Sequence, residues 1–343
     1  MNEWVCHVYG WRLRFVVLLA CCGVHAGALA ESLPRLPGLG AQGDTVTVSG
    51  LSAGGAMATQ FHLAHSATVR GAAIIAGIPY YCARYSALRA TTACMSPNML
   101  ARLPSVMTLV AEVDKQAAAH AIDTPAHLAD SRVWLGVGSR DEVVKAEVVE
   151  LAAGFYRHWL PAAAVRFETI PEAGHAMVTP DGGHACAETR TPFINQCGSF
   201  DTPGRLLAWL LGELKPKAEQ ANGELRVFDQ GEFTRGERSV GMGDKGWVYL
   251  PQSCLGGGCR VHVAFHGCQQ NDEAIDDAYV RTAGYNAWAE SNRLIVLYPQ
   301  TRRSLTNPGA CWDWWGYTGP DYHTRNAPQI RAVQAMIERL AGK

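Results

Sequence analysis

The chain has 343 residues, of which 48% are hydrophobic and 18% are charged. These proportions are ordinary for a soluble globular protein with a large core. The formal net charge is −1, and no long block of like charge is present, so no electrostatic footprint for nucleic acid is visible. Beyond the N-terminal segment, no stretch is long and apolar enough to cross a bilayer.

The N-terminus has the features of a secretory signal peptide. Arg12 and Arg14 precede an apolar run at 15–24, and a small-x-small cleavage site ends at Ala30. A lipoprotein cleavage box is a weaker alternative, because leucine stands just before the small residue. We therefore expect a protein secreted to the periplasm or the medium after cleavage near Ala30, with residues 31–343 as a single domain.

The cysteine count agrees with export. Three of the 11 cysteines lie in the predicted signal peptide, which leaves an even set of eight. Eight cysteines allow on the order of a hundred connectivities, so pairing of nearest neighbours is a hypothesis. The hypothesis pairs Cys82 with Cys94, Cys186 with Cys197, Cys254 with Cys259, and Cys268 with Cys311. No C-x-x-C spacing is present, so no metal site is expected.

Strand-like and helix-like runs alternate along the chain, which predicts an α/β fold with a mostly parallel sheet covered by helices on both faces. Strands are predicted at 45–50, 72–77, 133–138, 165–170, 224–233, 246–251, 260–265 and 294–298. Helices are predicted at 55–66, 97–119, 142–160, 203–214, 273–290 and 327–341. The polar stretch at 215–223 resembles a linker, but we do not interpret it as a domain boundary.

The segment Gly50-Leu51-Ser52-Ala53-Gly54 lies between a predicted strand and a predicted helix. This context is that of a nucleophile elbow, in which a tight turn exposes a strained serine and its neighbours must be small. The N–H of Ala53 can then face a developing oxyanion. The alternative is a glycine-rich turn whose serine only caps a helix.

A serine nucleophile needs a histidine base and an acid that orients the histidine. In an α/β-hydrolase both follow the serine in the chain, in loops after later strands. Asp141 and His175 occupy such positions after the strands at 133–138 and 165–170. The sequence leaves alternatives open, namely Asp130, Glu142, Asp181 and Asp201 for the acid and His184 for the base.

The second half of the chain contains a strand that runs into His266-Gly267. In ordinary α/β-hydrolases such a segment precedes the nucleophile and donates the second oxyanion-hole N–H, but here it comes much later. A circular permutation explains the order, with residues 224–343 supplying the early strands of the sheet and 45–214 the later ones. The alternative is that His266-Gly267 is only a turn.

At this point the sequence resembles a known family. The segment 50–58 is similar to the lipase box of secreted short-chain-length polyhydroxyalkanoate (polyhydroxybutyrate, PHB) depolymerases. The segments 266–270, 298–300 and 307–315 resemble the oxyanion side of that family, and their order resembles its permuted catalytic-domain type. The resemblance covers essentially the whole mature chain.

This resemblance implies a serine esterase with Ser52, Asp141 and His175 as the triad and the N–H groups of Ala53 and Cys268 as the oxyanion hole. A disulfide between Cys268 and Cys311 would anchor that hole. Many family members carry a separate polymer-binding domain, and none follows here before Lys343. The implied substrate is polyhydroxybutyrate or its oligomers, with no cofactor or metal, and we expect a monomer.

A polyester with small apolar repeats suits a cleft lined by aromatic rings. The candidates for substrate binding are Trp312, Trp314, Trp315, Tyr80 and Tyr81, and alternation suggests that Trp312 and Trp314 share a face. Each of these rings could instead pack in the core. Two other functions remain open, namely a carbohydrate esterase that removes acetyl or feruloyl groups with the same triad, and a catalytically dead binding protein on this fold.

Overall fold

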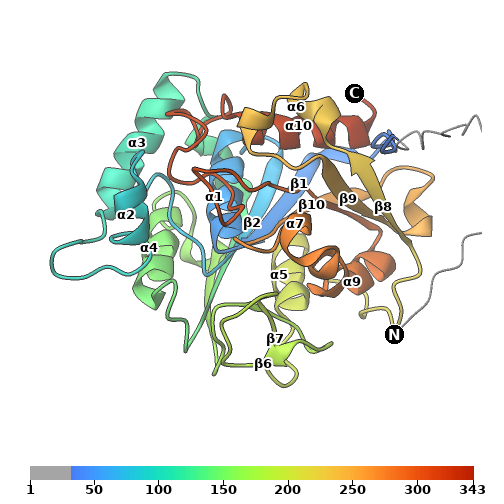
Figure 1. The fold of residues 1–343 in the computed structure, drawn as a ribbon, viewed down its shortest axis with the longest axis horizontal. Helices are drawn as coiled ribbons and strands as arrows, with labels where there is room; N and C mark the ends of the chain where they lie inside the picture. The colour runs from blue at the N-terminus through green and yellow to red at the C-terminus, as the bar shows by residue number, and fades with distance from the viewer. Residues whose placement is uncertain (1–31) are drawn as a thin grey trace, which may run out of the picture. The chain divides into compact units, whose positions relative to one another are not determined.

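An eight-stranded sheet, in which most neighbouring strands are parallel, carries the rest of the fold (Figure 1). The computed structural model describes residues 32–343, so the predicted signal peptide and its cleavage site lie outside the described residues. Residues 33–343 form one compact unit. Along the sheet the strands are β4 (Val165–Ile170), β3 (Arg132–Gly138), β2 (Val69–Ile75), β1 (Gln42–Leu51), β10 (Arg260–Phe265), β11 (Leu294–Tyr298), β9 (Lys245–Leu250) and β8 (Glu224–Asp229).

The strand order confirms the predicted permutation. β8 to β11, from the second half of the chain, form one half of the sheet, and β1 to β4 form the other half. The two halves meet where β1 pairs with β10 in parallel, with Gly50 opposite Phe265. β9 pairs in antiparallel fashion with both of its neighbours, β8 and β11, and the other described pairs of this sheet are parallel. The permutation therefore places the end of β1 beside the end of β10.

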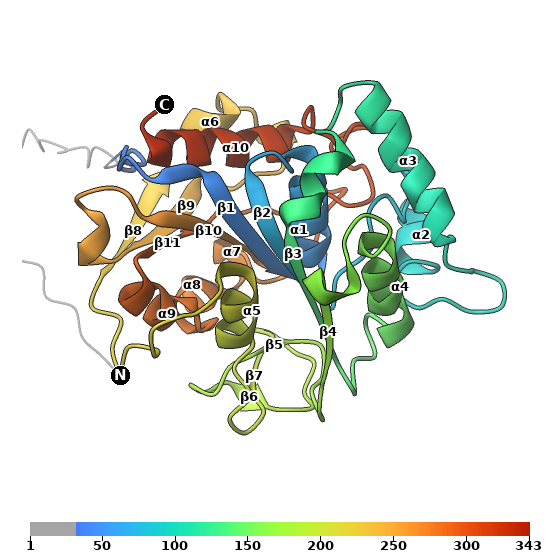
Figure 2. The ribbon, with the colours of Figure 1, turned by 180° about the vertical axis from the view of Figure 1, so that it is seen from behind.

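Helices cover both faces of the sheet, as Figures 1 and 2 show. On one face lie α1 (Ala53–Ala64), α3 (Val106–Ala118), α4 (Ala146–Tyr156) and α10 (Pro328–Ala341), and on the other lie α5 (Thr202–Leu211) and α9 (Tyr285–Asn292). The shorter helices are α2 (Ala87–Thr91), α6 (Gly231–Thr234), α7 (Asp272–Ile275) and α8 (Ala278–Thr282), with the 3-10 helices η1 (Pro125–Asp130), η2 (Ala162–Ala164), η3 (Arg238–Val240) and η4 (Gln252–Cys254). Because the central strands are covered on both faces, nearly all of their side chains are buried, and their sequences are largely apolar runs.

Two long helices predicted from the sequence are shorter or interrupted. The helix predicted at 97–119 begins only at Val106, where the Ser105 hydroxyl accepts a hydrogen bond from the Thr108 N–H. The helix predicted at 273–290 is three helices, because the backbone leaves the helical region at Asp276 (φ 50°) and Gly284 (φ 89°). Apolar spacing alone does not reveal such breaks.

A second, three-stranded sheet was missed by the sequence analysis. It consists of β5 (Met177–Val178), β7 (Ile194–Gln196) and β6 (His184–Ala185), in that order. Strands of two or three residues leave no periodic pattern in a sequence. This small sheet follows β4 and shapes the loops around His175.

The described chain contains the four disulfides that the spacing suggested: Cys82–Cys94, Cys186–Cys197, Cys254–Cys259 and Cys268–Cys311. Three of them close loops of 5 to 12 residues, and the fourth joins positions 43 residues apart. Within residues 32–343 no helix is long and apolar enough to span a membrane. The same residues bring together no group of three metal-ligating side chains that could hold an ion.

Candidate active site

Ser52 occupies a strained turn between β1 and α1. Its backbone has φ 57° and ψ −119°, and a positive φ is rarely adopted by residues with a side chain. Its N–H donates to the Ile75 carbonyl on β2 at 2.8 Å. The Ser52 side chain makes no capping hydrogen bond to the first turn of α1 as described, so the serine is not the helix cap that the sequence alternative proposed.

Glycines make this turn possible because other backbone segments lie very close to it. A Cβ atom added to Gly50 would lie 2.2 Å from the backbone of Gly54. A Cβ atom at Gly54 would lie 2.3 Å from the Phe265 carbonyl oxygen on β10. The pattern Gly-x-Ser-x-Gly is therefore required by close packing of the turn against itself and against β10.

Asp141 and His175 form a buried pair. The His175 Nδ1 and the Asp141 Oδ2 are 2.8 Å apart, and the two side chains are 6% and 1% exposed. The other carboxylate oxygen, Oδ1, accepts hydrogen bonds from the N–H groups of Val143 and Val144, each at 2.9 Å. The carboxylate is therefore held on both sides, and it fixes the orientation of the imidazole.

Two loops bring this pair together at the ends of β3 and β4. The Arg140 N–H donates to the Ala173 carbonyl at 2.9 Å, which ties the aspartate loop to the histidine loop. The His175 N–H donates to the Thr189 hydroxyl at 3.0 Å. A Cβ atom at Gly174 would lie 2.5 Å from the Ala187 carbonyl oxygen, so the glycine before the histidine is needed for this close approach.

The alternative acids and base have other roles. Asp201 caps α5 by accepting from the Gly204 N–H at 2.9 Å, and Asp181 pairs with Lys217. His184 lies 2.9 Å from the Thr191 carbonyl oxygen. The remaining two candidates, Asp130 and Glu142, are exposed. None of the five contacts His175 within the described chain.

The segment after β10 lies beside Ser52 and closes the site. Gly267, Cys268, Gln269 and Gln270 line the same cavity as Ser52 and His175. The Cys268–Cys311 disulfide joins this segment to the loop that precedes Trp312. Ala53 is the first residue of α1, so its N–H has no acceptor within the helix. The serine turn and the segment 267–270, one from each half of the sheet, therefore lie at the same cavity.

The cavity has a volume of about 540 Å³. Most of its lining is apolar, with Leu51, Ile78, Ala87, Ala90, Met95, Val143, Val144, Phe193, Trp314 and Trp315 among the residues that line it. Such a lining suits an apolar ligand whose few polar atoms are directed to one place. Sequence reasoning missed Phe193, Thr189 and the α2 side chains, because they come from segments without a recognisable motif.

The aromatic side chains divide into two groups. Trp314 and Trp315 line the cavity, and their contact with substrate stays a prediction. Trp312 and Tyr80 are fully buried at 0% and 1% exposure, and the prediction that they bind substrate is wrong for both. Trp312 packs edge-on against Phe265, with ring centres 5.0 Å apart, so it does not share a face with Trp314.

The structure also places Tyr81 outside the lining of the cavity, contrary to the prediction that it binds substrate. It is half-buried and stacks near Tyr322 and His323, with ring centres 6.1 and 4.3 Å away, and it does not belong to the described lining of the cavity. The loop after β2 does reach the cavity, but through Ile78. The aromatic positions of a loop cannot be assigned to core or cleft until its path is known.

Three further histidines are core residues. Burial lowers the pKa of His62 and of His262 to about 3, and that of His266 to about 4. His262 on β10 is hydrogen-bonded to Ser49 and Thr47 of β1, at 2.7 and 2.9 Å. These imidazoles are therefore neutral structural groups, and that of His262 joins β10 to β1.

The sheet order, the strained serine after a central strand and the aspartate–histidine pair define a circularly permuted α/β-hydrolase. No model of a known protein family matches the sequence. Among curated proteins, the chain is 32% identical over 336 residues to a polyhydroxybutyrate depolymerase of Talaromyces funiculosus, covering 92% of this chain and 95% of the relative. The chain belongs to the polyhydroxybutyrate depolymerase family.

A second relative is longer. The chain is 41% identical over 329 residues to a poly(3-hydroxybutyrate) depolymerase of Delftia acidovorans. The alignment covers 94% of this chain but only 64% of that enzyme. Two solved structures share the fold at 28% sequence identity. Each alignment covers 90% of this chain and 99% of the chain in the solved structure. One is a PHB depolymerase from Penicillium funiculosum, with a TM-score of 0.80. The other is a serine-to-alanine variant complexed with an R3HB trimer, with a TM-score of 0.81.

Proposed function

We propose that this chain is a serine esterase that hydrolyses the ester bonds of poly(3-hydroxybutyrate) or its oligomers. The observation that carries the proposal is the 2.8 Å contact of His175 with Asp141, in a cavity that Ser52 and Cys268 also line. The membership of the family and the apolar lining of the cavity support the polyester as substrate. The sugar-directed alternative has no comparable support, because hydroxyl-rich rings require more polar partners than this lining offers.

The mechanism follows from the geometry. The Ser52 hydroxyl attacks the ester carbonyl carbon while His175 takes the hydroxyl proton, and Asp141 stabilises the imidazolium that forms. The N–H groups of Ala53 and Cys268 bind the oxyanion. The bond from the carbonyl carbon to the alcohol oxygen then breaks, and His175 returns the proton to the departing alcohol. Water repeats the sequence on the acyl-enzyme and releases the acid end.

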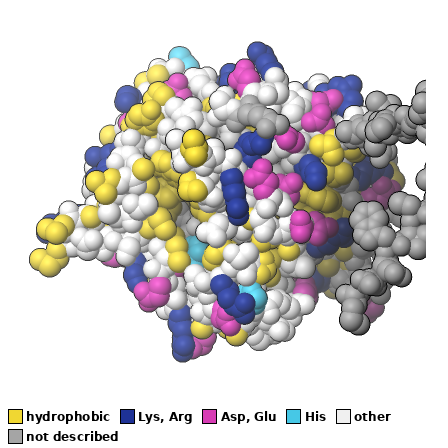
Figure 3. Space-filling model, in the orientation of Figure 1, with side chains coloured by type: hydrophobic (Ala, Val, Ile, Leu, Met, Phe, Trp, Pro, Cys, Tyr) yellow, Lys and Arg dark blue, Asp and Glu magenta, His cyan; other side chains and the backbone are white. Residues whose placement is uncertain are grey.

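Exposed apolar side chains, two of which adjoin residues that line the cavity, favour solid polymer over soluble oligomers. Leu88 of α2, Leu100 and Leu305 are 74%, 99% and 103% exposed. Ala87 and Ala90 of the same short helix line the cavity, and so does Thr306 beside Leu305. Figure 3 shows hydrophobic side chains gathered on this face, including the segment that projects at the left. A water-insoluble surface would cover them, and this removal of apolar area from water is favourable.

We also propose that residues 31–343 act as one catalytic domain after export. Four disulfides support an oxidising compartment. Cleavage near Ala30, export to the periplasm or the medium, and a monomeric state stay predictions. Sequencing of the N-terminus of the exported protein tests the cleavage site, and light scattering tests the monomer.

The decisive experiment is release of 3-hydroxybutyrate from amorphous polyhydroxybutyrate granules, with Ser52→Ala as the inactive control. Release by the unaltered chain alone is the expected result. Cleavage of p-nitrophenyl butyrate without release from granules would refute the polyester as substrate while retaining the serine chemistry. Replacing Leu88, Leu100 and Leu305 together by serine is expected to weaken binding to granules and leave p-nitrophenyl butyrate hydrolysis unchanged.

A further inference from the structure

In the segment 267–270, which lines the cavity, a single backbone N–H is without an acceptor in the described chain. The Gly267 N–H donates to the Gln270 Oε1 at 2.7 Å, and the Gln269 N–H donates to the Gly309 carbonyl at 2.7 Å. The Gln270 N–H donates to the Gly267 carbonyl at 3.3 Å. Among residues 32–343 the Cys268 N–H has no acceptor. The neighbouring donors are therefore occupied, and only the Cys268 N–H is left for a ligand.

The buried side chain of Gln270 stabilises this arrangement of donors. It is 1% exposed, and each end of its amide is paired. The Oε1 accepts from the Gly267 N–H, and the Nε2 donates to the carbonyl oxygens of Pro192 and Phe193 at 2.7 and 3.2 Å. Since the partners at one end are a donor and at the other end acceptors, only a neutral amide of this length satisfies them all.

The same amide joins the two sides of the site. Gly267 follows β10. Pro192 and Phe193 belong to the loop before β7, and this loop lies beside His175. The Phe193 ring meets the His175 ring edge-on, with centres 6.4 Å apart. The Phe193 carbonyl also accepts from the Met177 N–H at 2.9 Å, two residues after the histidine. A shift of Gln270 would therefore move the oxyanion donor relative to the histidine.

We propose that Gln270 is a positioning residue for the reaction. It holds the Cys268 N–H at the place where the oxyanion forms, and it fixes the position of that donor relative to the loop beside His175. The inference rests on the proposed function, because it assigns a role within the same serine-esterase site. Loss of a single oxyanion-hole donor lowers kcat by about 100- to 1000-fold, so displacement of the donor is expected to lower it by roughly 10- to 100-fold.

The first test is Gln270→Met, which keeps the length of the side chain and removes all three hydrogen bonds. With p-nitrophenyl butyrate, we expect kcat to fall by roughly 10- to 100-fold and KM to change by less than about threefold. Butylboronic acid adds to the serine oxygen as a tetrahedral anion, so it probes the oxyanion hole directly. Its inhibition constant is expected to rise by the same factor as kcat falls.

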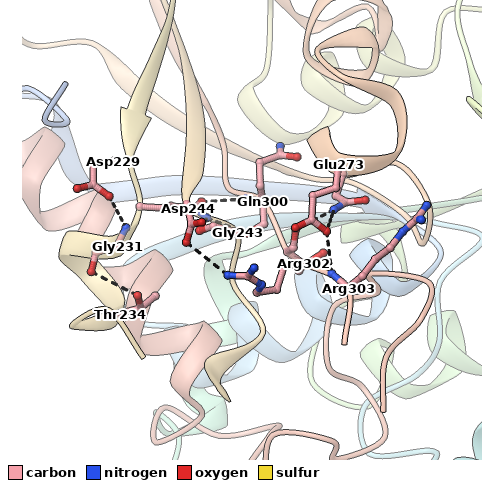
Figure 4. Close-up of polar contacts among 12 residues, drawn as sticks. Asp229, Gly231, Thr234, Gly243, Asp244, Glu273, Gln300, Arg302 and Arg303 are labelled. Carbon is pink, nitrogen blue, oxygen red and sulfur yellow. Dashed lines mark hydrogen bonds and ion pairs between the residues drawn. The ribbon is translucent and has the colours of Figure 1, made fainter. Parts of the chain in front are cut away.

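Gln230 provides a matched control. It is also fully buried, its Nε2 donates to the carbonyls of Gly243 and Gln300 at 2.9 and 2.8 Å, and its Oε1 accepts from the Gln300 N–H at 2.8 Å. Figure 4 shows Gly243 and Gln300 in the polar region at β8 and β9, and Gln230 does not line the described cavity. Gln230→Met is expected to lower the melting temperature about as much as Gln270→Met, with kcat changed by less than about threefold.

Gln270→Glu separates the two ends of the amide if the methionine variant fails to fold. The carboxyl group still accepts from the Gly267 N–H and loses the Nε2 donors. An ionised carboxylate would face the carbonyl oxygens of Pro192 and Phe193 with no proton to donate, and its charge would oppose the boronate anion. We expect the affinity for butylboronic acid and kcat for p-nitrophenyl butyrate both to fall by at least about tenfold.

Three results would overturn the inference: full kcat in Gln270→Met, a fall in kcat that Gln230→Met reproduces, or a kcat and boronate affinity in folded Gln270→Glu within about threefold of the unaltered chain. If the unaltered chain cleaves no ester at all, it is the proposed function that fails.

Discussion

Replacement of Asp141 by asparagine tests the assigned site most directly. The Asp141 Oδ1 accepts from two backbone N–H groups at 2.9 Å, and Oδ2 faces the His175 Nδ1 at 2.8 Å. In Asp141→Asn the amide oxygen must stay with the two N–H donors, because the flipped orientation would leave both of them unpaired at about 1–3 kcal/mol each. The amide NH₂ then faces Nδ1, and the imidazole is held in the tautomer that carries its proton toward Ser52.

A histidine in that tautomer cannot accept the serine proton. The corresponding change in a serine protease lowers kcat by about 10⁴, which is about 5.4 kcal/mol of activation free energy. We expect a loss of that order for p-nitrophenyl butyrate and a melting temperature close to that of the unaltered chain, since the two backbone hydrogen bonds remain and the third is only reversed in direction. The matched control is Glu142→Gln, whose side chain is 80% exposed and pairs with Lys145. More than a tenth of the activity remaining in Asp141→Asn would refute the reasoning.

Gly54→Ala is expected to unfold the protein or to lower its stability by more than about 2 kcal/mol, because the new methyl group meets a β10 carbonyl oxygen at 2.3 Å. Gly154→Ala, in α4 with its nearest contact at 3.5 Å, should stabilise by up to about 1 kcal/mol in the same urea titration. Trp314→Ala should impair granule hydrolysis more than p-nitrophenyl butyrate hydrolysis, and equal losses would indicate a packing role. His62 and His262, with pKa values of about 3, bind fewer protons folded than unfolded. Each should therefore cost roughly 2 kcal/mol of unfolding free energy between pH 6.5 and 4.5, and a flat unfolding free energy over this range would contradict their burial as neutral groups.

Local patterns in the sequence were sufficient for the serine turn. Tight turns impose residue types directly, since Gly50 and Gly54 have no room for a side chain, and such a requirement is visible without any knowledge of the fold. The alternation of strands and helices, together with a strand ending in His266-Gly267 far from the serine, also sufficed to predict the permuted sheet that β1 and β10 complete. The nearest-neighbour pairing of eight cysteines agrees with the structure because short loops bring their ends together.

Long-range geometry decided the rest. The choice of Asp141 and His175 over their alternatives depends on how the loops after β3 and β4 meet, which the sequence does not encode locally. Trp312 and Trp314 are two residues apart, yet one packs in the core and the other lines the cavity, because the loop that carries them is irregular. The role proposed for Gln270 depends on partners at both ends of its amide, and the two at the Nε2 end lie 77 and 78 residues away along the chain. Turn chemistry is a property of adjacent residues, whereas a cleft and its buried hydrogen bonds are made by segments that only the tertiary structure brings into contact.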